Sequence, residues 1–250
     1  MIWDFFDDIF CISLQNRKDR RNEVSKIFNE LNIPVKFFIV DKHPNGGIYG
    51  CFDSHLKIIK YMNEHNKNNI LVFEDDIIPT ESYNLKNIGN AIQFMKTNNS
   101  WDLFYLGYFP INYTNLYLNN NNITNNIIKY NPFATHAYCI NKRAIPKILN
   151  NYMQYIGKIH VDIFLSGYAS LNNYCYLPIL FEQKLCEDSD IESGNLIEYF
   201  ARRNQCLIQK TKIVWRFSIL KYYLHLYFNI LIFLTIILFI IIVVSQHYMI

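Results

Sequence analysis

The stretch Leu71-Val72-Phe73-Glu74-Asp75-Asp76 places three consecutive carboxylates directly after a short apolar run. Such a run is consistent with a buried strand. Ligands of open α/β sheets bind at the carboxyl ends of the strands, so the three acids are expected to face a ligand-binding crevice. Like charges side by side repel one another, which indicates that Glu74 to Asp76 serve a ligand rather than stability. The alternative is a solvated turn with an acidic helix cap.

A divalent cation would relieve this repulsion, and carboxylate oxygens suit Mn²⁺ or Mg²⁺, which also bridge the phosphates of a nucleotide diphosphate. Glu74 and Asp76 alternate at the strand end, so we expect them to point the same way as a metal-facing pair. Asp75 is then expected to turn toward the backbone or a sugar hydroxyl, or to cap a turn. His136, on a later strand, is a third candidate ligand, with a core histidine as the alternative.

Strand and helix signals alternate on both sides of the triplet, which favours an α/β fold with a mostly parallel sheet. The apolar runs predict strands, and the helical spacings predict helices, with an Asn-rich surface loop at 112–126. The predicted strands are 9–14, 35–40, 70–73, 103–106, 135–140 and 174–177, and the predicted helices are 17–31, 54–66, 85–96, 142–150 and 161–171.

The composition excludes several classes of protein. The formal net charge is only +3, so we expect no nucleic-acid partner. The six cysteines include no Cys-x-x-Cys pair, which argues against a zinc site and against a disulfide framework. Without its apolar last stretch, the chain of 250 residues has the size of one ordinary domain.

The C-terminal stretch 222–244 contains no Asp, Glu, Lys or Arg and is long enough to cross a bilayer core of roughly 30 Å as a helix. A very apolar core helix is the alternative. We therefore divide the chain into a catalytic domain at 1–205, a basic linker at 206–221, a transmembrane helix at 222–245 and a short tail at 246–250.

The side of the membrane on which the domain lies is left open by the sequence. Basic residues before the span place the domain in the cytoplasm by the positive-inside tendency. Three Asn-x-Ser/Thr sequons, at Asn98, Asn112 and Asn122, are usable only in a secretory lumen, and they point to the endoplasmic reticulum or Golgi as the alternative.

Seven short strings occur in an order that resembles glycosyltransferase family 25, which includes lipopolysaccharide and procollagen galactosyltransferases. The likeness spans about 9–191. The strings begin at Ile12 (ISLQNRKDRR), Gly50 (GCFDSH), Leu71 (LVFEDD), Trp101 (WDL, with Leu106-Gly107), Thr135 (THAY), Val161 (VDIFL) and Ser189 (SDI).

The resemblance implies a GT-A type fold, a Rossmann-like sandwich that binds a UDP-sugar with the help of a metal and transfers the sugar with inversion. Arg17 and Arg20 follow the first strand and suit bidentate phosphate contacts, with surface salt bridges as the alternative. Ser54 and His55 are expected to start a helix whose amides favour an anion, although His55 is equally consistent with a buried histidine. The residues expected to contact the donor are Ser13, Arg17, Arg20, Ser54, His55 and Asp75.

Inverting transfer requires a base that takes the proton of the acceptor hydroxyl. Asp162 is the first candidate, because it begins a predicted helix and matches an aspartate of the family; the alternative is an N-cap. Asp190 is the second candidate and Asp188 a further one. The expected activity is the transfer of galactose or glucose from a UDP-sugar to a glycan or a hydroxylated protein side chain.

Two other functions are consistent with parts of the sequence. A catalytically inert, membrane-tethered module that binds sugar nucleotides would need no intact acid triplet, so Glu74 to Asp76 argue against it. A two-metal hydrolase would need more His and Asp ligands than the sequence offers.

Overall fold

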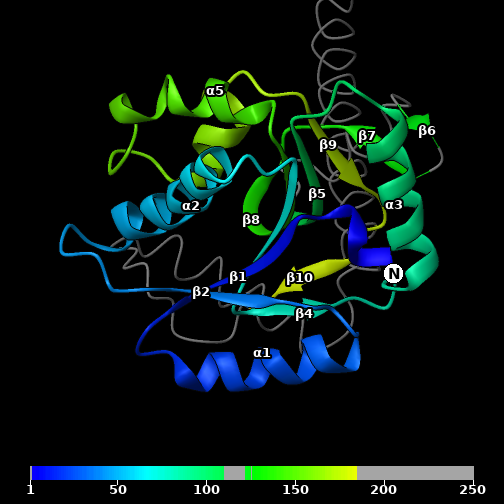
Figure 1. The fold of residues 1–250 in the computed structure, drawn as a ribbon, viewed down its shortest axis with the longest axis horizontal. Coiled ribbons are helices and arrows are strands. Elements are labelled where there is room, and N and C mark those ends of the chain that lie inside the picture. The colour runs from blue at the N-terminus through cyan, green and yellow to red at the C-terminus, as the bar shows by residue number, and fades with distance from the viewer. Residues whose placement is uncertain (1, 110–121, 125, 185–250) are drawn as a thin grey trace, which may run out of the picture.

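A computed structural model describes residues 2–109, 122–124 and 126–184. Eight strands form one sheet in the order β2-β1-β3-β8-β5-β9-β7-β6, and β4 and β10 form a second, two-stranded sheet (Figure 1). The strands are β1 Asp8–Leu14, β2 Lys36–Val40, β3 Asn69–Glu74, β4 Ile77–Pro79, β5 Leu103–Phe109, β6 Asn122–Thr124, β7 Ile127–Lys129, β8 Phe133–Asn141, β9 Asn173–Tyr176 and β10 Phe181–Gln183.

The large sheet is mixed, so the prediction of a mostly parallel sheet is wrong. Among the strands of the described residues, only the pairs β1–β2, β1–β3 and β5–β9 are parallel. Strand β8 lies between β3 and β5 and runs antiparallel to both. An apolar run indicates that a strand is buried but not which way it runs, so the sequence pattern gave no sign of this reversal. The coarser prediction of an α/β, Rossmann-like sheet is confirmed.

Helices cover both faces of the sheet, which makes a three-layer sandwich (Figure 1). One core joins the sheet to α1 and α3, and a second core joins its other face to α2 and α5. Strand β3 contributes to both, since Leu71 and Phe73 lie in the first core and Ile70 and Val72 in the second. The helices are η1 Ile2–Phe5, α1 Lys18–Glu30, α2 Gly47–Glu64, α3 Leu85–Thr97, α5 Ala144–Leu149, η2 Tyr152–Gln154, α6 Val161–Ile163 and η3 Phe164–Tyr168.

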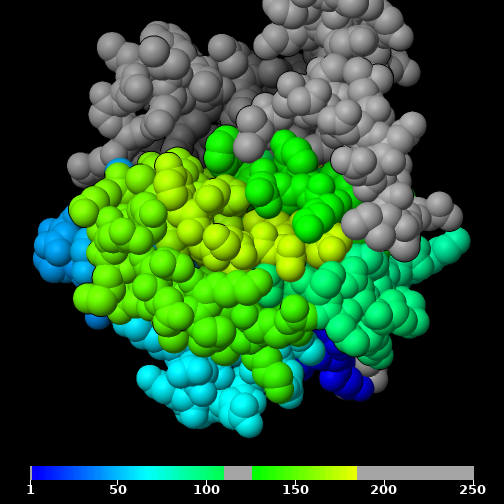
Figure 2. Space-filling view, turned by 90° about the horizontal axis from the view of Figure 1, so that it is seen from above, coloured from blue at the N-terminus to red at the C-terminus, as the bar shows by residue number. Residues whose placement is uncertain are grey.

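The second half of the described chain forms a continuous surface on one side of the molecule. In Figure 2 the green-to-yellow residues that follow β7 lie beside the cyan and teal residues of the first half. The predicted helix 161–171 falls in this half and is shorter than expected. Only Val161–Ile163 is α-helical, and the next five residues form one π-helical turn.

Helix α2 begins earlier than the sequence suggests. Gly46, with φ of +91°, precedes the first helical residue, Gly47. Ser54 therefore lies inside the helix, and its hydroxyl donates to the carbonyl of Gly50 at 2.7 Å. The expectation that Ser54 starts the helix is wrong, because two glycines with low helix propensity concealed its first turn from the apolar pattern.

Lysine and tyrosine side chains surround the buried carboxylate of Asp8 at the start of β1. Lys36 Nζ lies 2.6 Å from Oδ1, and Lys67 Nζ lies 2.8 Å from Oδ2. The Tyr61 hydroxyl donates to Oδ2 at 3.2 Å. Burial alone would raise the pKa of Asp8, but the hydrogen bonds from Lys36 and Lys67 outweigh burial and lower it.

We predict that Asp8→Asn lowers the free energy of unfolding at pH 7, and that the difference from the wild type shrinks in acid. The folded-state pKa lies below the usual carboxyl value, so the stabilisation is present above about pH 3.9 and is lost as the pH falls through the folded-state value. Chemical unfolding at pH 7 and pH 3 measures it. Asp41→Asn, at an exposed position, is the matched control. A difference that is unchanged at pH 3 contradicts the prediction.

No helix among the residues that the structure describes is both long and apolar enough to cross a membrane. The span predicted at 222–245 lies outside these residues. The span and the proposed domain limits therefore stay predictions.

Candidate active site

The acid triplet begins at the last paired residue of β3, at the carboxyl end of the parallel β1–β3 pair. Glu74 is the last residue of the strand and pairs with Ile12 of β1. Asp75 and Asp76 form the turn before β4. The alternation of side chains ends with the strand, so Glu74 and Asp76 do not share a direction: Asp75 and Asp76 both face Arg20, whereas Glu74 faces Thr135. Glu74 and Asp76 thus have different partners, and their role as a metal-facing pair stays a prediction.

Glu74 is held by neighbours from two elements. The Thr135 hydroxyl, on β8, donates to Glu74 Oε1 at 2.7 Å. His55 Nε2, on α2, lies 3.6 Å from the same oxygen. Burial would raise the pKa of Glu74, but the hydrogen bonds from His55 and Thr135, with the nearby charges, lower it. Glu74 is therefore the acid of the triplet that is most readily ionised.

His55 is buried and lies between Glu74 and Tyr138 of β8. Its Nδ1 is 2.9 Å from the Tyr138 hydroxyl. Because α2 begins at Gly47, His55 does not lie at a helix N-terminus, so the amides expected to attract an anion beside it are not there. In this arrangement His55 orients Glu74. Its direct contact with a donor stays a prediction.

Arg20 of α1 places a positive charge beside the other two acids. Its Nη1 lies 3.2 Å from Asp75 Oδ1 and 3.5 Å from Asp76 Oδ2, and all three side chains are about nine-tenths buried. Gln183 of β10 also donates to Asp76 Oδ2, at 2.9 Å. Arg20 thus offsets the charge of the acids in the chain without ligands.

Burial has the largest effect on the pKa values of Asp75 and Asp76. It raises the pKa of Asp75, against a hydrogen bond from Ser13 and the charge of Arg20. Burial, together with the charge of Glu74, raises the pKa of Asp76 to about 7. The pKa values of Glu74 and Asp76 are therefore shifted in opposite directions, and the negative charge is favoured on Glu74.

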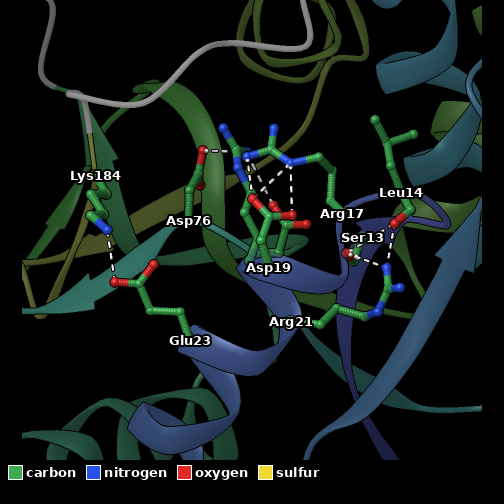
Figure 3. A network of polar contacts seen from close by, with 10 residues as sticks. Ser13, Leu14, Arg17, Asp19, Arg21, Glu23, Asp76 and Lys184 are labelled. Carbon is green, nitrogen blue, oxygen red and sulfur yellow. Dashed lines mark hydrogen bonds and ion pairs between the residues drawn. The ribbon is translucent and has the colours of Figure 1, made fainter.

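The predicted phosphate-binding residues lie around the end of β1 (Figure 3). Arg17 pairs with exposed Asp19, with Nη2 3.1 Å from Oδ2. Arg21 donates to the Ser13 hydroxyl at 3.1 Å and to the Leu14 carbonyl. Arg20 and Ser13 contact acids of the triplet, and the contact of Ser13, Arg17 and Arg20 with a phosphate stays a prediction.

His136 of β8 is fully buried and packs against Gly107 of β5. Its Nε2 donates to the Phe181 carbonyl at 3.1 Å, and burial lowers its pKa. The neutral ring then carries its proton on Nε2 and leaves Nδ1 as an acceptor. Within the described part of the chain, this buried Nδ1 has no hydrogen-bond partner.

The donors of the predicted metal site suit a divalent cation, but they are not assembled around one point. No three His, Cys, Asp or Glu side chains of the described residues are placed to hold one metal ion together. Asp76 Oδ1 is nevertheless buried without a hydrogen-bond partner, like His136 Nδ1. Two of the three predicted ligands thus offer an unsatisfied donor atom, while Glu74 is engaged by Thr135 and His55.

Asp162 lies in the first turn of α6, one residue after the helix begins at Val161, so it is not the N-cap, which is His160. Its Oδ2 accepts the backbone N–H of Ala134 at 2.9 Å, and its Oδ1 accepts that of Ile163 at 2.8 Å. Both carboxylate oxygens are therefore in contact with backbone amides. Asp190 and Asp188 lie outside the described residues, so their role as a base stays a prediction.

Three residues of the site did not emerge from sequence reasoning as functional. Thr135 and Tyr138 belong to the THAY string, which resembles the family, so this string could have indicated their contacts with Glu74 and His55. Gln183 had no signal, because its short strand β10 was not predicted. The sequence therefore marked the acids but not the side chains that hold them.

Gly107 of β5 packs directly against the His136 ring, and we predict that Gly107→Ala is destabilising. An added Cβ would lie 2.7 Å from the His136 ring and from the Phe181 carbonyl oxygen. Overpacking of this kind lowers the free energy of unfolding by about 1–3 kcal/mol. Gly167→Ala is the control, since its Cβ would meet nothing within 4 Å. Equal stability of the two variants in chemical unfolding contradicts the prediction.

The fold and the site define an α/β domain with buried acids at the carboxyl edge of its sheet, the class in which ligands bind at that edge. The sequence model of glycosyltransferase family 25 (LPS biosynthesis protein) matches residues 45–165, which include Glu74 to Asp76, His136 and Asp162. Over these residues the chain carries the sequence pattern of glycosyltransferase family 25.

Curated relatives carry related names. A glycosyltransferase 25 family member of Aedes aegypti is 31% identical over 126 residues, which cover 40% of this chain and 21% of the relative. Procollagen galactosyltransferase 1-A of Xenopus laevis is 28% identical over 175 residues, which cover 58% of this chain and 28% of the relative. The chain thus spans less than a third of the length of these relatives.

Solved structures overlap with this chain only in part. A glycosyltransferase involved in glycosylation of the major capsid of PBCV-1 is 12% identical, with a TM-score of 0.44, and the overlap covers 73% of this chain and 95% of that one. A197 from STIV is 11% identical with a TM-score of 0.42, over 67% and 79% of the two chains. Such partial overlaps establish neither a shared fold nor a shared function.

Proposed function

We propose that this chain is a metal-dependent glycosyltransferase that moves a hexose, galactose or glucose, from a UDP-sugar to a glycan or a hydroxylated protein side chain, with inversion at the anomeric carbon. The observation that carries the proposal is the acid triplet at the end of β3, in which buried Asp76 Oδ1 has no hydrogen-bond partner in the described chain. The match of residues 45–165 to the family 25 model and the name procollagen galactosyltransferase among the relatives support the donor class.

Glu74, Asp76 and His136 are the residues proposed to hold Mn²⁺ or Mg²⁺. The bound cation would stabilise the negative charge of the leaving diphosphate. Thr135 and His55 keep Glu74 ionised and in place. His136 is fixed by Phe181, with Nδ1 left as the donor atom.

The residues at the end of β1 are proposed to bind the donor. Arg17 and Arg20 would bind the diphosphate by charge and by bidentate hydrogen bonds. Arg20 would exchange a carboxylate for a phosphate oxygen, since it now lies 3.2 Å from Asp75. Ser13, Ser54, His55 and Asp75 complete the proposed donor contacts.

The proton of the acceptor hydroxyl must pass to a base as that oxygen attacks the anomeric carbon. Asp162 and Asp190 are the two candidates from the sequence, followed by Asp188. The contacts of Asp162 with two backbone amides favour a different role for it, which leaves Asp190 as the stronger candidate.

A donor screen tests the proposal. The full chain, purified in detergent and freed of metal with EDTA, should release UDP from UDP-galactose or UDP-glucose only after Mn²⁺ or Mg²⁺ is returned. Hydroxylysine peptides and simple glycans should then increase the rate as acceptors. Release that is equally fast with EDTA present would refute metal dependence, and no release from any UDP-hexose would refute the activity.

We also propose a single membrane anchor at 222–245, with the domain in the cytoplasm or, alternatively, in the lumen of the endoplasmic reticulum or Golgi. Asn98 distinguishes the two sides, because its sequon ends at Ser100 and lies at the end of α3, close to the surface. A glycosidase-sensitive mass shift that Asn98→Gln abolishes would place the domain in the lumen. Its absence, together with digestion of the domain by protease added from the cytoplasmic side, would place it in the cytoplasm.

A further inference from the structure

The backbone just before His136 adopts a conformation that alanine rarely occupies. Ala134 has φ of +67°, in the left-handed region. A residue with a Cβ is disfavoured there by roughly 1–2 kcal/mol, so the surrounding structure must hold it in place. Strain of this kind is common where a site fixes its geometry in advance.

The regular pairing of β8 does not hold this stretch. The ladder between β3 and β8 ends at the pair Phe73 and Ala137. The pairing with β5 is irregular on both sides of Gly107 and resumes only at Phe133. Residues 134–136 therefore lack the continuous backbone hydrogen bonds that fix the rest of the strand.

Asp162 supplies the missing anchor. Its Oδ2 accepts the Ala134 N–H at 2.9 Å, and its neighbours Val161 and Phe164 are buried in the core shared with α2. A hydrogen bond to a carboxylate is stronger than one between neutral groups. Asp162 thus offers a fixed and strong acceptor for the N–H that the left-handed conformation directs toward it.

Thr135, the residue after Ala134, links this part of the backbone to the acid triplet. Thr135 is buried, and its hydroxyl donates to Glu74 Oε1 at 2.7 Å. If Ala134 relaxed to a negative φ, the peptide plane would rotate and Thr135 would leave Glu74. The contacts therefore run from Asp162 through the Ala134 amide and Thr135 to Glu74.

We propose that Asp162 is a positioning residue, which acts through Ala134 and Thr135 to hold Glu74 in place, and is not the base that deprotonates the acceptor. This inference rests on the proposed function, in which Glu74 is a metal ligand. It assigns Asp162 an effect on metal affinity that a base would not have.

Glycine provides the decisive test, because it adopts a positive φ without strain. Asp162→Asn retains the shape of the side chain but presents an amide donor to one of the two backbone N–H groups. Ala134→Gly in the Asp162→Asn background should restore the position of Thr135 without the anchor. Ser170→Gly is the matched control, because Ser170 also has a positive φ, of 53°, in an exposed position before β9.

The readouts are Mn²⁺ affinity, by calorimetry of the full chain well below its thermal midpoint, and the rate of UDP release. We expect Asp162→Asn to weaken Mn²⁺ binding on the order of tenfold, as for other residues that orient a metal ligand. Ala134→Gly should recover most of this loss, and Ser170→Gly none. UDP release should follow the same order.

If Asp162 is a base, Asp162→Asn should bind Mn²⁺ with unchanged affinity but lose UDP release, and Ala134→Gly should not recover that release. This result would overturn the inference. Recovery by Ser170→Gly as well would also overturn it. A wild-type chain that binds Mn²⁺ but releases no UDP contradicts the proposed function alone. The Mn²⁺ affinities of the wild type, of Asp162→Asn and of its combinations with Ala134→Gly and Ser170→Gly then still decide the role of Asp162.

Discussion

Replacing Asp76 by asparagine is expected to abolish UDP release while making the metal-free chain more stable. Loss of one carboxylate ligand should reduce Mn²⁺ affinity and UDP release on the order of 100-fold or more. The stabilisation follows from the raised pKa of Asp76, about 7, which burial and the charge of Glu74 produce. In the wild type, stability is therefore lost as the pH rises from about 4 through 7, because the unfolded chain ionises Asp76 more readily.

The Asp76→Asn variant should escape this loss, so its advantage in unfolding free energy should be absent near pH 4 and reach as much as a few kcal/mol at pH 8, given about 1.4 kcal/mol per pKa unit. Thermal unfolding in EDTA at pH 4 and pH 8 measures it. Glu182→Gln is the control: burial raises the pKa of Glu182 too, but it lies on β10 outside the triplet, so this variant should still bind Mn²⁺. An Asp76→Asn chain that retains UDP release, or is less stable at pH 8, contradicts the prediction.

Arg20→Gln is expected to destabilise the chain, and the size of this loss should depend on whether metal is present. The guanidinium lies 3.2 Å from Asp75 and 3.5 Å from Asp76, with side chains about nine-tenths buried. Removing it leaves two buried carboxylates without this counter-charge, which should lower the free energy of unfolding by about 2–4 kcal/mol at pH 8. A bound Mn²⁺ would replace the missing charge, so Mn²⁺ should raise the thermal midpoint of the variant more than that of the wild type.

The matched control for this experiment is Arg17→Gln. Arg17 pairs with Asp19, whose side chain is 66% exposed, and such surface pairs contribute little to stability. Arg17→Gln should therefore leave the thermal midpoint and its response to Mn²⁺ near the wild-type values. If Mn²⁺ stabilises Arg20→Gln no more than the wild type, the cation does not occupy the neighbourhood of Asp75 and Asp76.

The sequence predicted those parts of the fold that follow from local apolar patterns. Strand β3 and the helices α1 and α3 lie within a few residues of their expected positions, because each combines a clear apolar period with polar ends. The direction of β8 was not predictable, because strand direction depends on how the chain returns across the sheet. Strands β4 and β10 have three residues each, too few for any period.

The site was predicted as a set of residue types but not as a geometry. The acids were found because three charges after an apolar run are unusual, yet their directions depend on where β3 ends, at Glu74. The contacts of Thr135 with Glu74 and of Asp162 with Ala134 join residues 61 and 28 positions apart. Such contacts arise from the register of β8 and from one strained residue, neither of which is encoded in a local pattern.

Calorimetric titration of UDP-galactose and UDP-glucose into the full chain, with and without Mn²⁺, tests the central claim most directly. That claim is that Glu74 and Asp76, with His136, hold the metal that binds a UDP-sugar donor. We predict that at least one of the two sugars binds the wild-type chain in the presence of Mn²⁺, and that binding is lost in EDTA and in Asp76→Asn. A wild-type chain that binds neither sugar with Mn²⁺ present would contradict the claim.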